Sequence, residues 1–352
     1  MAATVDASLR IAMVSYYLPS GSKIGVGFQA HELANALVRR GHRVDMFSEC
    51  PPVEGALYGH RRVHLAGSLR TFRFAWALRR IDFSSYDVIH AHGDDYWLWR
   101  RRTSVHVRTM HGSSFEEARR VPRLREKLRM LLLGVSEVMA TFAADVTVAV
   151  SPATRRWTPW VRRVIPNGVD TDRFHPDPPR RAEAPTVLFV GTWRNRKRGR
   201  DLAAAFQRDV LPIHPDARLE MVCRDAPEDP GPGVSVLGEL SDADLIAAYQ
   251  RAWVFCLPSA YEGFGIPYAE AMACGLPVVA TPNIGARFVT DHGRAGVLAP
   301  LAEIGVAIEK LVADPDRREA LAAASASRAR SFAMAHVVAS YEGLYATRQR
   351  RP

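Results

Sequence analysis

The chain alternates short apolar strand patterns with amphipathic helix patterns, and this order limits its possible folds more than any other feature. Strand patterns occur at residues 10–15, 43–47, 87–91 and 104–109, and they resume after residue 185. Strands that alternate with helices form parallel sheets covered by helices on both faces. The alternation therefore predicts an α/β protein with doubly wound parallel sheets.

A proline-rich segment interrupts this alternation near the middle of the chain. Residues 174–185 contain four prolines, which forbid regular structure, and a new strand pattern opens at residues 186–190. A chain of 352 residues is too long for one typical core and long enough for two α/β domains. We therefore expect one domain over residues 1–175 and a second that begins at residue 176.

The composition is that of an ordinary soluble globular protein. Hydrophobic residues make up 47% of the chain and charged residues 24%. No apolar run approaches the length of a membrane span, and the N-terminus lacks the basic and apolar regions of a signal peptide. The four cysteines form no C-x-x-C pair. We expect a cytoplasmic protein with reduced thiols.

Positive charge is concentrated in the first half of the chain. Residues 1–175 carry 26 Lys and Arg against 16 Asp and Glu, whereas residues 176–352 carry 21 of each kind. Basic clusters at residues 100–102, 119–120 and 123–129 would suit an anionic membrane surface at the inner face of the membrane, a phosphorylated acceptor or nucleic acid. The alternative is a solvated Arg-rich face, which is the more ordinary origin of such clusters.

The helix pattern at residues 122–142 carries an apolar stripe beside its basic cluster. The residues that share this face are Leu124, Leu128, Leu131, Val135 and Met139. A stripe at helical spacing is more often a core contact than a membrane anchor. We expect this face to be buried.

Residues 258–281 combine a strand end, a glycine-rich turn, a short helix and another strand. Glu262 and Glu270 lie on either side of the turn, with seven residues between them, and Pro267 suits the first helical position. The backbone amides from Gly263 to Ile266 would be free donors at a positive helix end, which attracts anions. Carboxylates beside such a site are suited to bind hydroxyls. The free amides and the two carboxylates together predict a ligand with phosphate and polyol groups, such as a nucleotide-sugar.

This segment resembles the E-x7-E signature of retaining glycosyltransferases with the GT-B fold, in particular family 4. The resemblance extends over the surrounding Pro-Ser-x-x-Glu-Gly-Phe-Gly and Glu-Ala-Met-Ala-Cys-Gly-Leu-Pro sequences. It implies two Rossmann-like domains that face each other across a cleft. The domain at 1–175 would be on the acceptor side, the domain at 176–332 would bind the nucleotide-sugar, and a final helix at 333–352 would cross back to the first domain.

The resemblance also assigns roles in donor binding. Glu270 would bind the ribose hydroxyls, and Glu262 would hold hydroxyls of the transferred sugar together with the amides of Phe264, Gly265 and Ile266. These roles follow from the family and not from the spacing alone.

The segment at residues 190–202 resembles the family element that supplies two cations to the diphosphate. The match is imperfect, because Thr192 stands where Arg usually follows the glycine and the segment is one residue longer. The candidate cations are Arg194, Arg196, Lys197 and Arg198. We favour Arg198, which precedes Gly199 where the family has Lys, as the cation that stabilises the leaving group.

Two features of the first half complete the implied site. Gly25 and Gly27 precede a helix and resemble the family's glycine loop, which faces the donor diphosphate. His111 belongs to Thr109-Met-His-Gly112 at a strand end and would contact the transferred sugar. No nucleophile and general acid stand together, so the family's front-face mechanism with retention is expected.

We infer no metal and no other cofactor. Three Asp-x-Asp sequences occur, at residues 170–172, 242–244 and 314–316, but none lies between strands as in a metal-binding GT-A site. Ser241 and the two aspartates after it are typical of a helix cap.

The expected partners are a nucleotide-sugar donor and a small-molecule hydroxyl acceptor. A lipid or phosphorylated carrier at the membrane is the alternative acceptor, and nucleic acid is not expected. A non-enzymatic sugar-nucleotide binder is a rival, and so is an NAD-dependent dehydrogenase. The dehydrogenase is disfavoured because Gly25-Val-Gly27 lacks a third glycine and the acidic ribose-binding residue.

Overall fold

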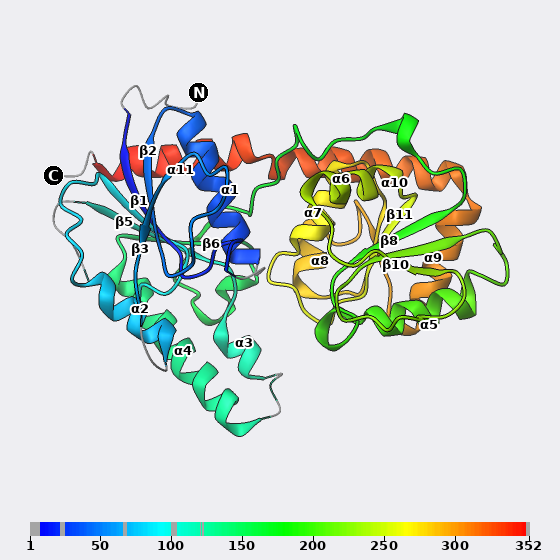
Figure 1. Ribbon diagram of the computed structural model, residues 1–352, viewed down its shortest axis with the longest axis horizontal. Coiled ribbons are helices and arrows are strands. Elements are labelled where there is room, and N and C mark those ends of the chain that lie inside the picture. The colour runs from blue at the N-terminus through cyan, green and yellow to red at the C-terminus, as the bar shows by residue number, and fades with distance from the viewer. Residues whose placement is uncertain are drawn as a thin grey trace. The chain divides into compact units, whose positions relative to one another are not determined.

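The computed structural model describes residues 8–21, 25–65, 69–99, 104–119, 121 and 123–349. The basic cluster at 100–102, Arg120, residue 122 and the end of the expected final helix at 350–352 lie outside these described residues. The chain divides into two compact units (Figure 1). Unit 1 comprises Met1–Gly168 and Met334–Pro352, and unit 2 comprises Val169–Ala333.

Unit 1 is built on a fully parallel seven-stranded sheet in the order β3-β2-β1-β4-β5-β6-β7. Its strands are β1 (Arg10–Val14), β2 (Arg43–Ser48), β3 (Gly59–Arg62), β4 (Val88–Ala91), β5 (Val105–Met110), β6 (Val146–Ala149) and β7 (Arg163–Val164). Its α-helices are α1 (Gly25–Arg39), α2 (Arg70–Leu78), α3 (Ser114–Ala118), α4 (Leu124–Ala143) and α11 (Met334–Gln349).

Unit 2 contains a second parallel sheet, in the order β10-β9-β8-β11-β12-β13. Its strands are β8 (Thr186–Val190), β9 (Arg218–Val222), β10 (Val234–Val236), β11 (Val254–Leu257), β12 (Val278–Ala280) and β13 (Val297–Leu298). Its α-helices are α5 (Gly199–Asp209), α6 (Asp242–Arg251), α7 (Ile266–Ala273), α8 (Ile284–Val289), α9 (Ile304–Ala313) and α10 (Pro315–Ala329). The expectation of two doubly wound parallel-sheet domains is confirmed.

The division between the units lies after Gly168, earlier than the boundary expected at residue 175. Residues just beyond it pack into unit 2, where the rings of Phe174 and Tyr249 lie 5.8 Å apart. At the other end of the chain, α11 packs into the core of unit 1. Its buried residues in that core are Met334, Val337, Val338, Tyr341, Leu344 and Tyr345.

The expectation that the apolar stripe of α4 is buried is wrong. Leu124 is 70% exposed, Leu128 52% and Val135 54%. The helix packs instead through another face, whose buried residues are Leu133, Gly134, Ala140, Thr141 and Ala143. Small residues on that face allow close approach, and an added Cβ at Gly134 would lie 2.8 Å from the ring of Phe115. Helical periodicity identifies the residues on one face but not which of two apolar faces is buried.

In the part of the chain that is described, no helix has both the length and the apolar character needed to cross a membrane. The cysteines Cys50, Cys223, Cys256 and Cys274 are all free and buried. The three Asp-x-Asp sequences contribute local hydrogen bonds to the backbone: Asp170 accepts from Asp172 N, Ser241 caps α6 through Asp244 N, and Asp314 caps α10. The prediction of a cap at Ser241 is confirmed.

Gly27 allows close contact between the first turn of α1 and the preceding loop. An added Cβ there would lie 2.9 Å from the carbonyl atoms of Tyr17 and 3.0 Å from Cα of Leu18. Backbone atoms cannot rotate out of the way. This close approach explains why residue 27 is a glycine, whether or not a ligand binds beside it.

We predict that Gly27→Ala destabilises the chain by about 1–3 kcal/mol, because the methyl group overpacks this contact. The matched control is Gly343→Ala in α11, where an added Cβ meets nothing within 4 Å. That substitution should leave the unfolding midpoint unchanged or raise it, because Ala favours a helix interior. Thermal unfolding followed by circular dichroism measures both. Equal midpoints for the two variants would contradict the close-contact account.

Candidate functional site

Two loops meet at the carboxyl edge of the sheet in unit 2. One follows β8 and spans residues 191–198, and the other follows β11 and spans 258–265. Because β8 and β11 are adjacent and parallel, their ends lie at one edge, where open α/β sheets bind ligands. Hydrogen bonds join the loops: Ala260 N donates to Arg196 O at 2.7 Å, and Ser259 Oγ donates to the same oxygen at 3.1 Å.

This junction brings two cations to Glu262. Lys197 Nζ lies 2.7 Å and Arg196 Nη1 2.9 Å from Glu262 Oε1. The side chain of Lys197 is only 15% exposed and that of Glu262 8%. A buried charge requires a partner, and removing one member of such a pair commonly costs about 3–5 kcal/mol. Arg196, Lys197 and Glu262 therefore form one unit, the carboxylate–cation cluster.

Burial and charge oppose each other within this cluster. Burial raises the pKa of Glu262, but the positive charges of Lys197 and Arg196 have the larger effect in the opposite direction. The pKa of Glu262 is therefore below its usual value. Burial lowers the pKa of Lys197, and the carboxylate of Glu262 opposes that effect. Glu262 is consequently an ionised hydrogen-bond acceptor at neutral pH.

Glu270, about one turn into α7, is in a different state. Its Oε2 accepts a hydrogen bond of 2.8 Å from the hydroxyl of Tyr249, which is fully buried. Burial raises the pKa of Glu270 to about 7, although the Tyr249 hydrogen bond acts in the opposite direction. The two carboxylates of the same motif thus differ in charge near neutral pH.

The turn between Glu262 and Glu270 leaves backbone N–H donors available. Gly265 precedes α7 with φ of 94°, and a Cβ there would lie 2.3 Å from the ring of Tyr268. The amides of Phe264 and Gly265 donate no hydrogen bond to any described residue, and Ile266 begins the helix. Gly285 N holds the turn by donating to Glu262 O at 2.9 Å. The arrangement fits the anion site expected at this helix end.

The other two candidate cations are not part of the cluster. The backbone N–H of Arg194 donates to Asp225, and its side chain is exposed. Arg198 adopts a left-handed backbone with φ of 59° and forms no side-chain hydrogen bond or ion pair with a described residue. The structure therefore brings Arg196 and Lys197, but neither Arg194 nor Arg198, into contact with Glu262.

In unit 1, His111 follows the end of β5 and contacts another histidine. His111 Nε2 lies 2.8 Å from His92 Nδ1, and the two rings stack with centroids 5.1 Å apart. Burial lowers the pKa of His111 to about 4, and the neighbouring side chain of Asn167 acts in the opposite direction. His111 is therefore neutral at physiological pH. A base this weak is better suited to hydrogen bonding than to accepting a proton.

A neighbouring network connects these strand ends to α11. His90 Nδ1 lies 2.7 Å from the Tyr345 hydroxyl, and His90 Nε2 lies 2.8 Å from Thr109 Oγ1. Thr109 Oγ1 is in turn 2.9 Å from the hydroxyl of Tyr341. This network holds the ends of β4 and β5 in place beside His111.

A buried charged group beside the histidines was missed from the sequence. Arg108, within β5, is fully buried and forms an ion pair with Asp95, which also accepts a hydrogen bond of 2.9 Å from His106. Burial raises the pKa of the adjacent Asp94 to about 6. The available signal was the Asp94-Asp95 pair soon after a buried strand.

Gly25 and Gly27 begin α1, and residues 22–24 before them lie outside the described residues.

Comparisons with known proteins agree across both units. A family model described as "Glycosyltransferase Family 4" matches residues 24–173, and one described as "Glycosyl transferases group 1" matches residues 184–314. The D-inositol 3-phosphate glycosyltransferase of Xylanimonas cellulosilytica is 30% identical over 97% of this chain and 98% of its own. The alpha-maltose-1-phosphate synthase of Mycolicibacterium smegmatis is 29% identical over 94% and 97%.

Solved structures share the arrangement of strands and helices. Sucrose-phosphate synthase from Thermosynechococcus elongatus aligns with a TM-score of 0.79 at 24% identity, covering 96% of this chain and 98% of the other. Anabaena HepE in complex with UDP-glucose aligns with a TM-score of 0.75 at 17% identity, covering 96% and 100%. These likenesses agree with the GT-B fold. The chain belongs to the family 4 glycosyltransferases, also described as glycosyl transferases group 1.

Proposed function

We propose that the chain is a retaining glycosyltransferase that moves a sugar from a nucleoside diphosphate donor to an acceptor hydroxyl without a metal. The carboxylate–cation cluster carries this proposal. The largely buried Lys197 and the ionised Glu262 of this cluster lie along one sheet edge with the amides of Phe264 and Gly265, which donate to no described residue. Cations and amides suit a diphosphate, whereas carboxylates suit sugar hydroxyls.

In this proposal, Lys197 and Arg196 neutralise the diphosphate, helped by the amides of Phe264 and Gly265. Lys197 replaces Arg198 as the favoured cation, because its ammonium already contacts Glu262 at 2.7 Å. A preorganised cation stabilises charge that develops on the leaving phosphate and so accelerates the chemical step. The side chains take the role that a metal ion has in other transferases.

Glu262 and His111 are proposed to hold hydroxyls of the transferred sugar, and Glu270 the ribose hydroxyls. The reaction breaks the bond between the anomeric carbon and the phosphate oxygen and forms one to the acceptor oxygen. The acceptor proton passes to the departing phosphate on the same face of the sugar. Retention follows from this shared face. The low pKa of His111 supports a positioning role and disfavours one as general base.

The acceptor is proposed to be a small molecule with a free hydroxyl. Relatives with this architecture include enzymes named for inositol 3-phosphate, and also the phosphatidyl-myo-inositol mannosyltransferase of Mycobacterium leprae, which is 27% identical. A lipid-linked acceptor is therefore the second candidate. Gly25 and Gly27 are proposed to face the donor diphosphate on the strength of the family resemblance.

We predict that Lys197→Gln lowers kcat by about 10²–10³, because the leaving phosphate loses a preorganised cation. Glutamine removes the positive charge and keeps an N–H donor, on a side chain that is one atom shorter. Arg198→Gln is the matched control and should lower kcat less than about tenfold. Turnover with a screened nucleotide-sugar, with and without EDTA, measures both effects. A greater loss in the Arg198 variant would contradict the assignment, and a loss in EDTA restored by a divalent cation would contradict metal independence.

Donor affinity should depend on pH through Glu270. Its pKa is raised to about 7, so the carboxylate is mostly protonated below pH 7 and ionised above it. An ionised carboxylate accepts hydrogen bonds from ribose hydroxyls more strongly, so affinity for the nucleoside diphosphate should fall as pH falls from 8 to 6. We predict that Glu270→Gln weakens binding at pH 8 by about 1–3 kcal/mol and flattens this pH profile.

Isothermal titration at several pH values measures this dependence, with the exposed Glu319→Gln as a control. The control should keep the wild-type profile. An unchanged affinity in the Glu270 variant at pH 8 would remove the ribose assignment.

We predict that His111→Ala lowers turnover while its remaining product keeps the anomeric configuration of the donor. Loss of the imidazole misplaces the sugar but removes no proton acceptor that the front-face step needs. NMR coupling constants of the anomeric proton identify the configuration in product from both proteins. An inverted product from either protein would overturn the mechanism.

A further inference from the structure

Large apolar side chains are exposed almost only in unit 1. Among the described residues, fourteen such side chains are exposed in unit 1 and two in unit 2, namely Ile213 and Val306. Scattered single exposures are normal, but a cluster of this size on one unit marks an interaction surface. Seven of the fourteen lie on α4, and we call them the α4 stripe. They are Leu124, Leu128, Leu131, Leu132, Val135, Met139 and Phe142.

The α4 stripe is continuous along the helix. At about 100° per residue, its seven members fall within an arc of about 100°, roughly opposite the packed face. That packed face anchors the helix, because Gly134 lies against Phe115 and Leu133 packs in a cluster with Tyr96 and Ala140. Leu132 is 63% exposed and Phe142 55%. The helix is therefore held by one apolar face and displays another.

Cations border the stripe on both sides. By the same helical geometry, Arg125 and Arg129 fall along one edge and Lys127 along the other. All three are exposed, and none forms an ion pair with another described residue. An apolar stripe flanked by Lys and Arg is the pattern of a helix that lies in the interface of a membrane.

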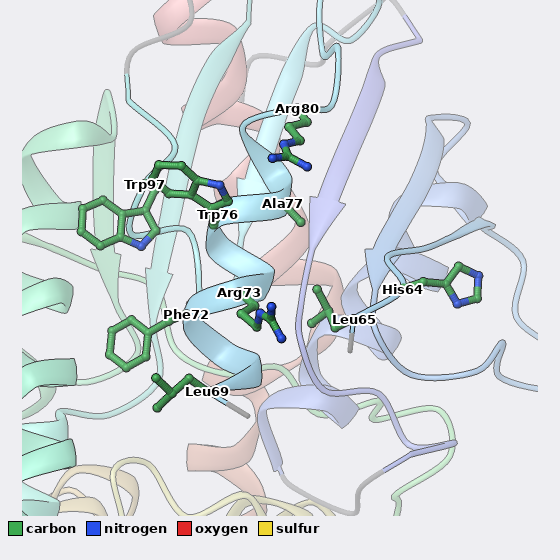
Figure 2. A pocket seen from close by; sticks show the side chains of 9 residues that line it. All are labelled: His64, Leu65, Leu69, Phe72, Arg73, Trp76, Ala77, Arg80 and Trp97. Carbon is green, nitrogen blue, oxygen red and sulfur yellow. The ribbon is translucent and has the colours of Figure 1, made fainter. Parts of the chain in front are cut away.

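Tryptophans lie at the end of the stripe and on the adjacent helix. The ring of Trp160 stacks on Phe142 with centroids 5.1 Å apart, and its indole N–H donates to Thr141 Oγ1 at 2.9 Å. On α2, Trp76 lies beside Trp97 at the rim of a pocket of about 570 Å³ (Figure 2). Tryptophan is enriched where a protein meets the membrane–water interface.

The same pocket adds further positive charge. Its lining includes Arg73 and Arg80, together with Leu65, Leu69 and Phe72 (Figure 2). The helices α2 and α4 share an apolar cluster that contains Ala75 and Leu133, so the two surfaces are neighbours. Cationic and apolar groups thus occur together on this part of unit 1.

We propose that unit 1 docks on an anionic lipid bilayer through the α4 stripe, with Arg125, Lys127 and Arg129 at the level of the headgroups. Charge complementarity favours this occupant. A second copy of the chain would bring two cationic surfaces together, whereas an anionic bilayer offers opposite charge beside an apolar layer. The docking needs no donor, so it stands or falls independently of the proposed reaction.

The test is co-sedimentation of the full chain with vesicles of phosphatidylcholine alone or with about 30% phosphatidylglycerol, near the anionic content of a charged leaflet. We expect binding to the anionic vesicles at low salt and release near 1 M salt, where the Debye length falls to about 3 Å. Arg125→Gln with Arg129→Gln should lower the partition coefficient roughly 30-fold, at about fivefold per cation. Leu128→Gln with Leu132→Gln and Val135→Gln should lower it at least about tenfold.

Ile213→Gln, an equally exposed apolar site in unit 2, is the matched control and should bind as the wild type does. The far-UV circular dichroism spectrum and the thermal unfolding midpoint of every variant show whether the fold is intact. A second readout uses Leu132→Cys labelled with an environment-sensitive dye, since the four native cysteines are buried. The dye should shift to the blue only with anionic vesicles.

Three outcomes would overturn the proposal. The first is no binding of the wild type to anionic vesicles at low salt. The second is binding that survives both α4 variants. The third is a stable dimer in light scattering that the apolar variant dissociates, which would assign the stripe to a second copy of the chain.

Discussion

The contact between Lys197 and Glu262 is the interaction on which the donor site depends. It joins the loop after β8 to the loop after β11. Lys197 Nζ lies 2.7 Å from Glu262 Oε1, and both side chains are largely excluded from solvent. Two buried charges are tolerated only as a pair, so each holds the other in place. The backbone bond from Ala260 to Arg196 and the adjacency of β8 and β11 make that pairing geometrically possible. A sheet with another strand order would separate these loops.

Burial determines how the titratable groups of both units behave. Glu262 is ionised because two cations outweigh its burial, while burial dominates at Glu270 and raises its pKa to about 7. His111 stays neutral because burial lowers its pKa to about 4. The residue type alone would suggest two equivalent carboxylates and a titrating histidine. Their environments give each a separate role in binding.

The sequence predicted the fold well because alternating strands and helices permit few topologies. The parallel sheets, the start of unit 2 near the proline-rich segment and the helix after Gly265 all follow from local patterns. Choices that depend on packing could not be made from local patterns. Arg198 and Lys197 are adjacent cations, and the packed structure brings Lys197 to Glu262, whereas Arg198 has a left-handed backbone. Five residues of the α4 stripe were assigned to the core, because periodicity cannot tell which apolar face packs.

The central claim is that a nucleoside diphosphate sugar binds along the sheet edge of unit 2. A crystal structure of the chain with an unreactive donor analogue tests it most directly. The account predicts phosphate oxygens within about 2.7–3.1 Å of Lys197 Nζ and of the amides of Phe264 and Gly265, with the ribose hydroxyls at Glu270. A diphosphate that contacts Arg198 instead of Lys197, or that binds away from this edge, would contradict it.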